Sequence, residues 1–159
     1  MATLAAERRG PTLYTAAALS LVAGLVHLWV MPEHFGEWWG YGAFFLVSAA
    51  AQLLYAPLLL RRPTRALLLA GIAGNLAIVV LYLLTRTTGI PLVGPEAGEV
   101  ENFGLADVCA TTSEIGISLA LSAALLRNVT PERRRTILLG AAVALVLVGH
   151  VVHLLLRAS

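Results

Sequence analysis

The sequence predicts an all-α integral membrane protein, a single bundle of five transmembrane helices. Apolar residues make up 58% of the 159 residues and charged residues only 13%, whereas soluble domains carry about 25% charged residues. The apolar residues gather in five stretches of 19 to 22 residues, each close to the ~20 that a helix needs to cross the hydrocarbon core. Too little chain remains outside them for a soluble catalytic or nucleotide-binding domain. The predicted spans are 13–31, 42–60, 66–85, 105–126 and 136–156.

The first span, 13–31, resembles a secretory signal peptide in position. Its apolar run is longer than a typical signal core and no A-x-A-like cleavage site follows, so we expect it to be retained. Residues 32–41 (PEHFGEWWGY) begin with Pro32, which favours a helix stop. The segment also carries Trp38, Trp39 and Tyr41, aromatic residues typical of a membrane interface. We therefore predict an interfacial turn between the first two spans.

The connections after the second and fourth spans are short, charged turns, RRPTR and RNVTPERRR. The connection 86–104, between the third and fourth spans, is much longer and rich in Gly and Pro (RTTGIPLVGPEAGEVENFG). Connections of that length without regular structure are often functional. We expect it to form a lid over one end of the bundle.

The charges predict the orientation of the bundle. All eleven basic residues are Arg, and nine of them fall before the first span or in the turns after the second and fourth spans. Basic loops stay on the cytoplasmic side, which predicts an inside N-terminus, an outside C-terminus and a location in the plasma membrane. This distribution explains the basic residues without a nucleic-acid partner.

Polar residues recur within each span at steps of three or four, which places them on one helical face. Such stripes are expected to face the bundle interior. By helical rise, Gln52, Asn75 and Glu114 lie near the bilayer midplane, and most of the other strongly polar groups lie in the outer half. The sequence thus predicts an outward-facing pocket in the bundle. Its expected lining residues are His27, Arg86, Glu101, Asp107, Glu114, His150 and His153.

Histidine and carboxylate groups from separate helices are the typical ligands of a metal site in a helical bundle. The leading hypothesis is a transition-metal site (Zn, Cu or Fe), or another metallo-cofactor, with catalysis on a membrane-soluble substrate left open. Asp107 and Glu114 are the candidate catalytic carboxylates, with Asp107 near the metal or acting as general base. Arg86 would hold the lid through Glu101 or Asp107, and Arg86, Glu101, Asn75 and Gln52 would bind the cofactor. The predicted metal ligands are His27, Glu114, His150 and His153.

Three alternatives remain. His27 with His150 or His153 would suit axial ligation of a b-type haem, with Gly24 and Gly149 leaving room for the ring. A carboxylate and histidine near the interface would also suit proton exchange with a quinol or a lipid headgroup. Finally, the stripes would hold the helices together in a transporter component, an oligomer or a larger membrane complex without catalysis.

The segment from Arg86 to Glu114 reads R-T-x-G-x-P-x-x-G-P-x-x-G-x-x-E-x-x-G-x-x-D-x6-E. It resembles a pattern in small bacterial multi-pass membrane proteins of unassigned function. The resemblance covers under a fifth of the chain and implies no activity. It implies that the long loop and the face carrying Asp107 and Glu114 belong to one recurring unit.

Overall fold

The computed structural model describes residues 10–89, 94–127, 129–132, 135–136 and 139. The chain divides into two units, Met1–Leu125 and Leu126–Ser159. Of the second unit, the described part includes a helical hydrogen bond from the Thr136 hydroxyl to the Glu132 carbonyl oxygen, 3.1 Å long. The predicted fifth span, 136–156, lies outside the described residues except for Thr136 and Leu139, as do His150 and His153.

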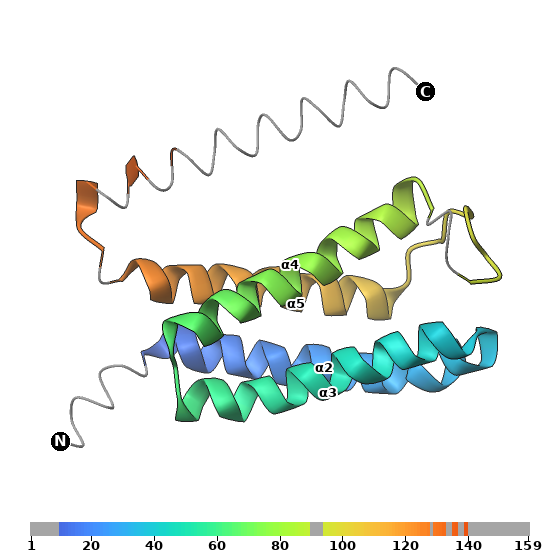
Figure 1. Ribbon diagram of the computed structural model, residues 1–159, viewed down its shortest axis with the longest axis horizontal. Helices are drawn as coiled ribbons and strands as arrows, with labels where there is room; N and C mark the ends of the chain where they lie inside the picture. Colours follow the sequence, from blue (N-terminus) through green and yellow to red (C-terminus); the bar gives the residue numbers. More distant parts are fainter. Residues whose placement is uncertain (1–9, 90–93, 128, 133–134, 137–138, 140–159) are drawn as a thin grey trace. The chain divides into compact units, whose positions relative to one another are not determined.

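The first unit contains four long helices and, among its described residues, no strand (Figure 1). All four are long and apolar enough to cross a membrane, as a multi-pass membrane protein requires. Each predicted span from the first to the fourth corresponds to one helix. The helices are α2 (Pro11–Glu37), α3 (Trp39–Arg61), α4 (Arg65–Thr87) and α5 (Leu105–Leu126).

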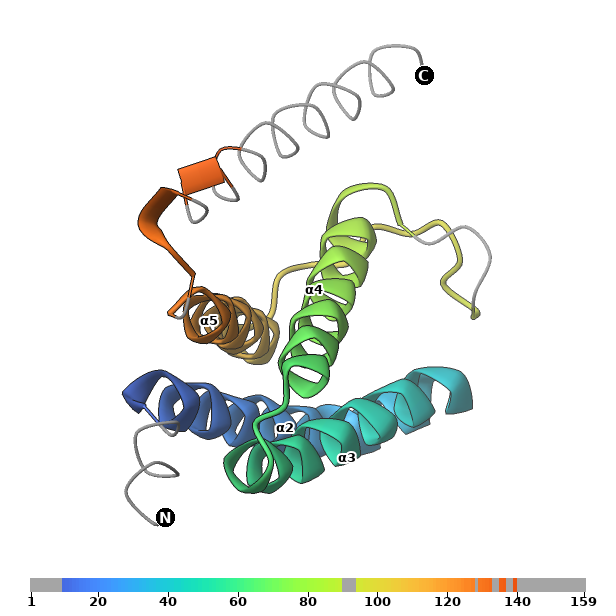
Figure 2. The same ribbon diagram turned by 60° about the vertical axis from the view of Figure 1, so that its left-hand side comes forward.

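Helices α2 and α3 lie side by side in both views of the bundle (Figures 1 and 2). Gly24 allows this close approach, because a Cβ there would lie 2.9 Å from a side-chain carbon of Leu53 and 3.2 Å from its backbone nitrogen. Small residues at helix contacts are typical of membrane bundles. The apolar core includes residues from all four helices: Leu13, Ala16, Ala17, Ala56, Leu59, Leu68, Ile117 and Leu121.

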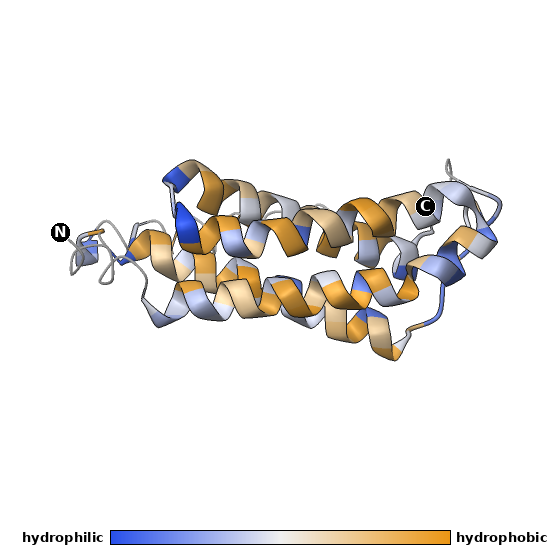
Figure 3. Ribbon diagram, turned by 90° about the horizontal axis from the view of Figure 1, so that it is seen from below, coloured by the Kyte–Doolittle hydropathy of each residue, from blue (hydrophilic) through white to orange (hydrophobic). Residues whose placement is uncertain are grey.

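The bundle exposes large apolar side chains and buries polar ones. Trp29, Leu54 and Leu119 are 67 to 75% exposed, and hydrophobic residues run along the helices in Figure 3. This distribution suits contact with lipid rather than water. For the four described helices it also confirms the prediction that the polar stripes face inward, because the following polar residues are buried: Ser20, His27, Ser48, Gln52, Asn75, Ser113, Glu114 and Ser118.

The predicted turn over residues 32–41 is wrong for most of its length. Pro32 lies inside α2, and the helix continues to Glu37 before a single extended residue, Trp38, separates it from α3. Proline removes only its own hydrogen bond, and helices in a bilayer tolerate that loss when the surrounding bonds persist. The longer helix brings His34 and Glu37 onto the same rigid element as His27.

The described part of the long loop folds back on itself. Gly89 has a φ of +68°, and a Cβ there would lie 2.7 Å from backbone atoms of Gly98 and Glu99. Further along, the Glu101 amide donates to the Thr85 carbonyl oxygen over 3.0 Å. These contacts return the chain to the end of α4, from which it enters α5.

Candidate functional site

A cavity of about 550 Å³ lies within the first unit, at the end where α2 meets α3 and α4 leads into the loop. All four helices and the loop line it. His27 and Glu114 are its most buried polar residues, 3% and 1% exposed, and we call them the floor. Arg86, Glu101 and Asp107 also line the cavity and lie where the loop returns to the helices; we call them the mouth.

The floor is a direct contact between two helices 87 positions apart in sequence. His27 Nε2, from α2, lies 3.0 Å from Glu114 Oε1, from α5. The hydrogen bond requires one proton between the two atoms, so the pair is able to exchange a proton with a bound molecule. Glu114 lies about 14 Å along α5 from its first residue, which places this chemistry deep in the bundle.

Gln52 and Asn75 support the floor from behind. The Gln52 side-chain amide donates to Asn75 Oδ1 at 3.3 Å and to Glu114 Oε1 at 3.4 Å. Asn75 in turn donates to the Gly71 carbonyl oxygen at 2.7 Å. Both residues were predicted to bind a cofactor, but neither lines the cavity. Their contacts position the Glu114 carboxylate instead.

Two polar atoms of the floor have no hydrogen-bond partner among the described residues. They are Glu114 Oε2 and His27 Nδ1. An unpaired buried polar atom costs about 1–3 kcal/mol, and more when the group is charged. The floor therefore holds two buried hydrogen-bonding atoms that the four described helices leave without a partner.

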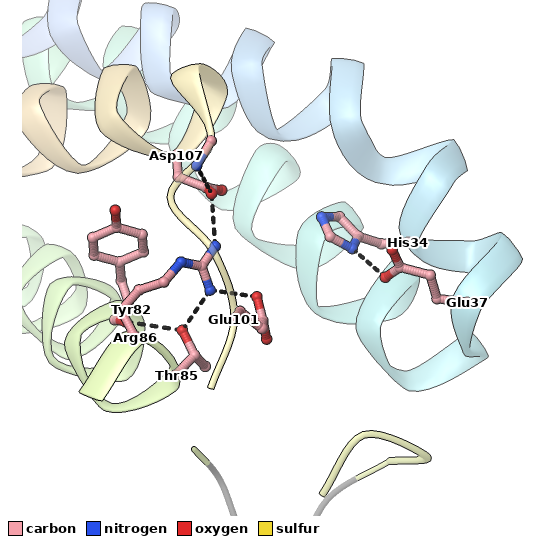
Figure 4. Close-up of polar contacts among 8 residues, drawn as sticks. His34, Glu37, Tyr82, Thr85, Arg86, Glu101 and Asp107 are labelled. Atoms are coloured by element: carbon pink, nitrogen blue, oxygen red, sulfur yellow. Dashed lines mark hydrogen bonds and ion pairs between the residues drawn. The ribbon is translucent and has the colours of Figure 1, made fainter. Parts of the chain in front are cut away.

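Arg86 organises the mouth (Figure 4). Its Nη2 donates to Asp107 Oδ2 at 2.6 Å, and its Nη1 donates to Glu101 Oε2 and to Thr85 Oγ1. Its guanidinium carbon lies 5.0 Å from the ring centroid of Tyr82, within the range of a cation–π contact. The predicted pairing of Arg86 with Glu101 or Asp107 is thus present with both partners at once.

Asp107 has a second structural contact. Its Oδ2 accepts the Gly104 amide at 3.1 Å, in the manner of an acidic N3 residue that reaches back to the residue before its helix. These are the contacts of a structural ion pair and a helix cap. The role of Asp107 as a general base stays a prediction.

A second histidine and carboxylate, His34 and Glu37, also line the cavity and were not predicted (Figure 4). His34 Nδ1 lies 2.7 Å from Glu37 Oε2. The His34 ring stacks on Phe45 at 4.1 Å between centroids, and Phe45 is 5.6 Å from the His27 ring. The seven-residue spacing of His27 and His34 would have revealed this shared face had α2 been expected to continue through Pro32.

The predicted metal site is represented by two of its four ligands. Within the described ranges, no group of three or more His, Cys, Asp or Glu residues is arranged to hold a metal ion. His27 and Glu114 are in contact, and the other two predicted ligands, His150 and His153, lie outside the described residues. Leu53 fills the space beside Gly24, where the haem hypothesis required room for a ring.

Comparison of the chain with protein-family models, with curated proteins and with solved structures finds no match.

Proposed function

We propose that this protein binds a small, membrane-soluble molecule in the cavity and that the floor pair recognises the molecule's polar group. The observation that carries the proposal is Glu114 Oε2, which belongs to a cavity-lining residue only 1% exposed and has no hydrogen-bond partner among the described residues. Ionisable groups deep in membrane bundles are costly and are usually kept for function. A ligand that donates a hydrogen bond to this oxygen would remove the cost.

The size and lining of the cavity support the same proposal. Ligand pockets commonly measure about 300–1,000 Å³ and combine apolar walls with a few placed polar groups. This cavity measures about 550 Å³ and presents Phe44, Phe45, Ile78 and Leu81 beside the floor pair. A molecule with an apolar body and one polar end would satisfy both surfaces.

The proposal places the mouth on the outer side of the plasma membrane. The opposite end of the helices carries Arg61, Arg62 and Arg65, and basic loops stay in the cytoplasm. The mouth end carries most of the acidic residues. A ligand would therefore enter from the outer leaflet or from the extracellular side.

The test compares cavity-filling and lipid-facing tryptophans. Thr111 lines the cavity, whereas Leu119 on the same helix is 67% exposed. We expect mass spectrometry of solvent extracts to find a discrete small molecule that copurifies with the wild-type protein and with Leu119→Trp. The Thr111→Trp variant, folded to the same extent by circular dichroism, should have lost it. Equal small-molecule content in all three proteins, or none in any, would overturn the proposal.

A transition-metal site is the second candidate function, favoured by the distance between His27 Nε2 and Glu114 Oε1. The two atoms are 3.0 Å apart, and two ligands that each lie ~2.1 Å from one ion, at about 90° to 110°, are separated by about 3.0–3.4 Å. A metal would take the place of the shared proton. The other two ligands predicted from the sequence, His150 and His153, lie outside the described residues.

Elemental analysis of the gently purified protein tests the metal candidate. We expect about one equivalent of Zn, Cu or Fe in the wild-type protein and a loss of most of it in His27→Gln. The control His34→Gln removes the other cavity histidine and should retain the metal. Metal content below about a tenth of an equivalent, with no haem absorbance, would contradict both the metal and the haem hypotheses.

A further inference from the structure

The charge of the cavity indicates which class of molecule it accepts. Among the described residues, six carboxylates and one guanidinium line it, and the chain contains no lysine. Even with both lining imidazoles protonated, the formal charge of the lining is −3. The six carboxylates are Glu37, Glu96, Glu99, Glu101, Asp107 and Glu114.

These carboxylates are not equally neutralised. Arg86 pairs with Glu101 and Asp107 at the mouth, His34 pairs with Glu37, and His27 contacts Glu114 through one carboxylate oxygen. Within the described part of the chain, Glu96 and Glu99 form no ion pair, and Glu114 retains the unpaired Oε2 at the floor. Carboxylate oxygens without a partner among the described residues thus line the cavity from the exposed loop to its most buried residue.

The walls between mouth and floor are aromatic. Tyr41, Phe44, Phe45 and Tyr82 line the cavity together with Trp38. Aromatic faces attract cations through the negative charge of the ring face, and the attraction is stronger where water is excluded. Arg86 already occupies such a position over Tyr82.

We infer that the ligand of this cavity is an organic cation, an amine with a compact apolar body. The inference rests on the proposed binding function and names its ligand class. The ammonium group would donate to Glu114 Oε2, and the apolar body would contact the aromatic walls. Glu96 and Glu99 would attract the cation to the mouth, because a cleft lined by charges of one sign concentrates ions of the opposite sign.

Three probes of nearly equal shape and different charge test the inference: phenylethylamine, protonated at neutral pH, the uncharged phenylethanol and the anionic phenylpropanoate. Binding is measured by isothermal titration calorimetry on the full chain in lipid nanodiscs, with empty nanodiscs as the blank. We expect the amine to bind at least about tenfold more tightly than the alcohol, because a charge-assisted hydrogen bond contributes about 1.5–3 kcal/mol. Phenylpropanoate should not bind.

Glu114→Gln keeps the size of the floor residue and removes its charge. We expect it to weaken amine binding about tenfold and to leave phenylethanol binding nearly unchanged. Glu33→Gln is the matched control, because Glu33 is an exposed residue of α2 that does not line the cavity. Amine affinity should be the same in Glu33→Gln as in the wild type.

The outcomes separate the two proposals. Equal affinities for amine and alcohol, both weakened by Glu114→Gln, would overturn the cationic ligand and leave the binding cavity standing. Amine binding that neither Glu114→Gln nor Thr111→Trp alters would overturn both proposals.

If Glu114→Gln does not fold, the double variant Glu96→Gln/Glu99→Gln tests the inference at two exposed residues instead. Its amine affinity should fall about threefold at low salt and converge with that of the wild type at high salt, because exposed charges are screened. An unchanged amine affinity at low salt would contradict the inference.

Discussion

At the scale of single residues, a buried amide holds the floor of the cavity in place. Gln52 is the one residue of α3 seen to hydrogen-bond with both Asn75 of α4 and Glu114 of α5. We expect Gln52→Leu to lower the free energy of unfolding by about 1–2 kcal/mol. The substitution removes the amide that donates to two buried acceptors, Asn75 Oδ1 and Glu114 Oε1. Ser118→Ala is the control, because its hydroxyl bonds only to a carbonyl oxygen of its own helix. Its loss should cost less than about 1 kcal/mol, and equal costs would contradict the bridging role.

Arg86 is the residue on which the mouth depends. Its side chain is 7% exposed, and its removal would leave Glu101 and Asp107 without their common cation. We expect Arg86→Gln to cost about 1–3 kcal/mol, less than for a fully buried pair because both carboxylates are partly exposed. Hydrogen exchange of the loop amides should accelerate at the same time. Arg86→Gln combined with Asp107→Asn should recover part of the loss, whereas Arg61→Gln, at an exposed helix end, should change neither quantity.

The sequence predicted the floor residues and the ion pairs of the mouth, but not the orientation of Gln52 and Asn75 or the presence of His34 and Glu37 in the cavity. His27, Glu114 and the Arg86 ion pairs followed from residue type and helical spacing, because charged groups inside a membrane must find partners. Gln52 and Asn75 were placed correctly in the interior, but their orientation toward Glu114 depends on how three helices pack. The role of His34 and Glu37 was missed because a proline was given more weight than the continuing helical spacing.

At the scale of helices, small residues decide how closely the elements approach. Gly24 and Gly74 provide a matched pair, because a Cβ at Gly24 would meet Leu53 while a Cβ at Gly74 would meet nothing within 4 Å. We expect Gly24→Ala to destabilise the bundle by about 1–3 kcal/mol through overpacking. Gly74→Ala should be neutral or stabilising by up to about 1 kcal/mol, because alanine favours the helix. Unfolding in mixed detergent micelles measures both, and equal effects would contradict the proposed close contact of α2 with α3.

The boundaries of the helices show where sequence patterns are sufficient. The fourth predicted span coincides with α5, because Gly104 and Asp107 form a local start signal. The second and third spans each differ from α3 and α4 by a few residues. Hydropathy alone does not mark where a helix ends beyond its apolar run, and α2 accordingly continues to Glu37.

At the scale of the whole molecule, the predicted orientation requires the two ends of the bundle to face different compartments. Glu96 lies in the loop at the mouth, and Arg62 lies between α3 and α4 at the opposite end. We expect a thiol at Glu96→Cys to react with a membrane-impermeant maleimide in intact cells, and a thiol at Arg62→Cys to react only after the membrane is permeabilised. The background carries Cys109→Ala, because Cys109 is the only native cysteine and is exposed. The reverse labelling pattern would show that the acidic mouth faces the cytoplasm. Because basic loops stay inside, that result would mean that the arginines do not set this topology, and a cationic ligand would then reach Glu114 from the cell interior.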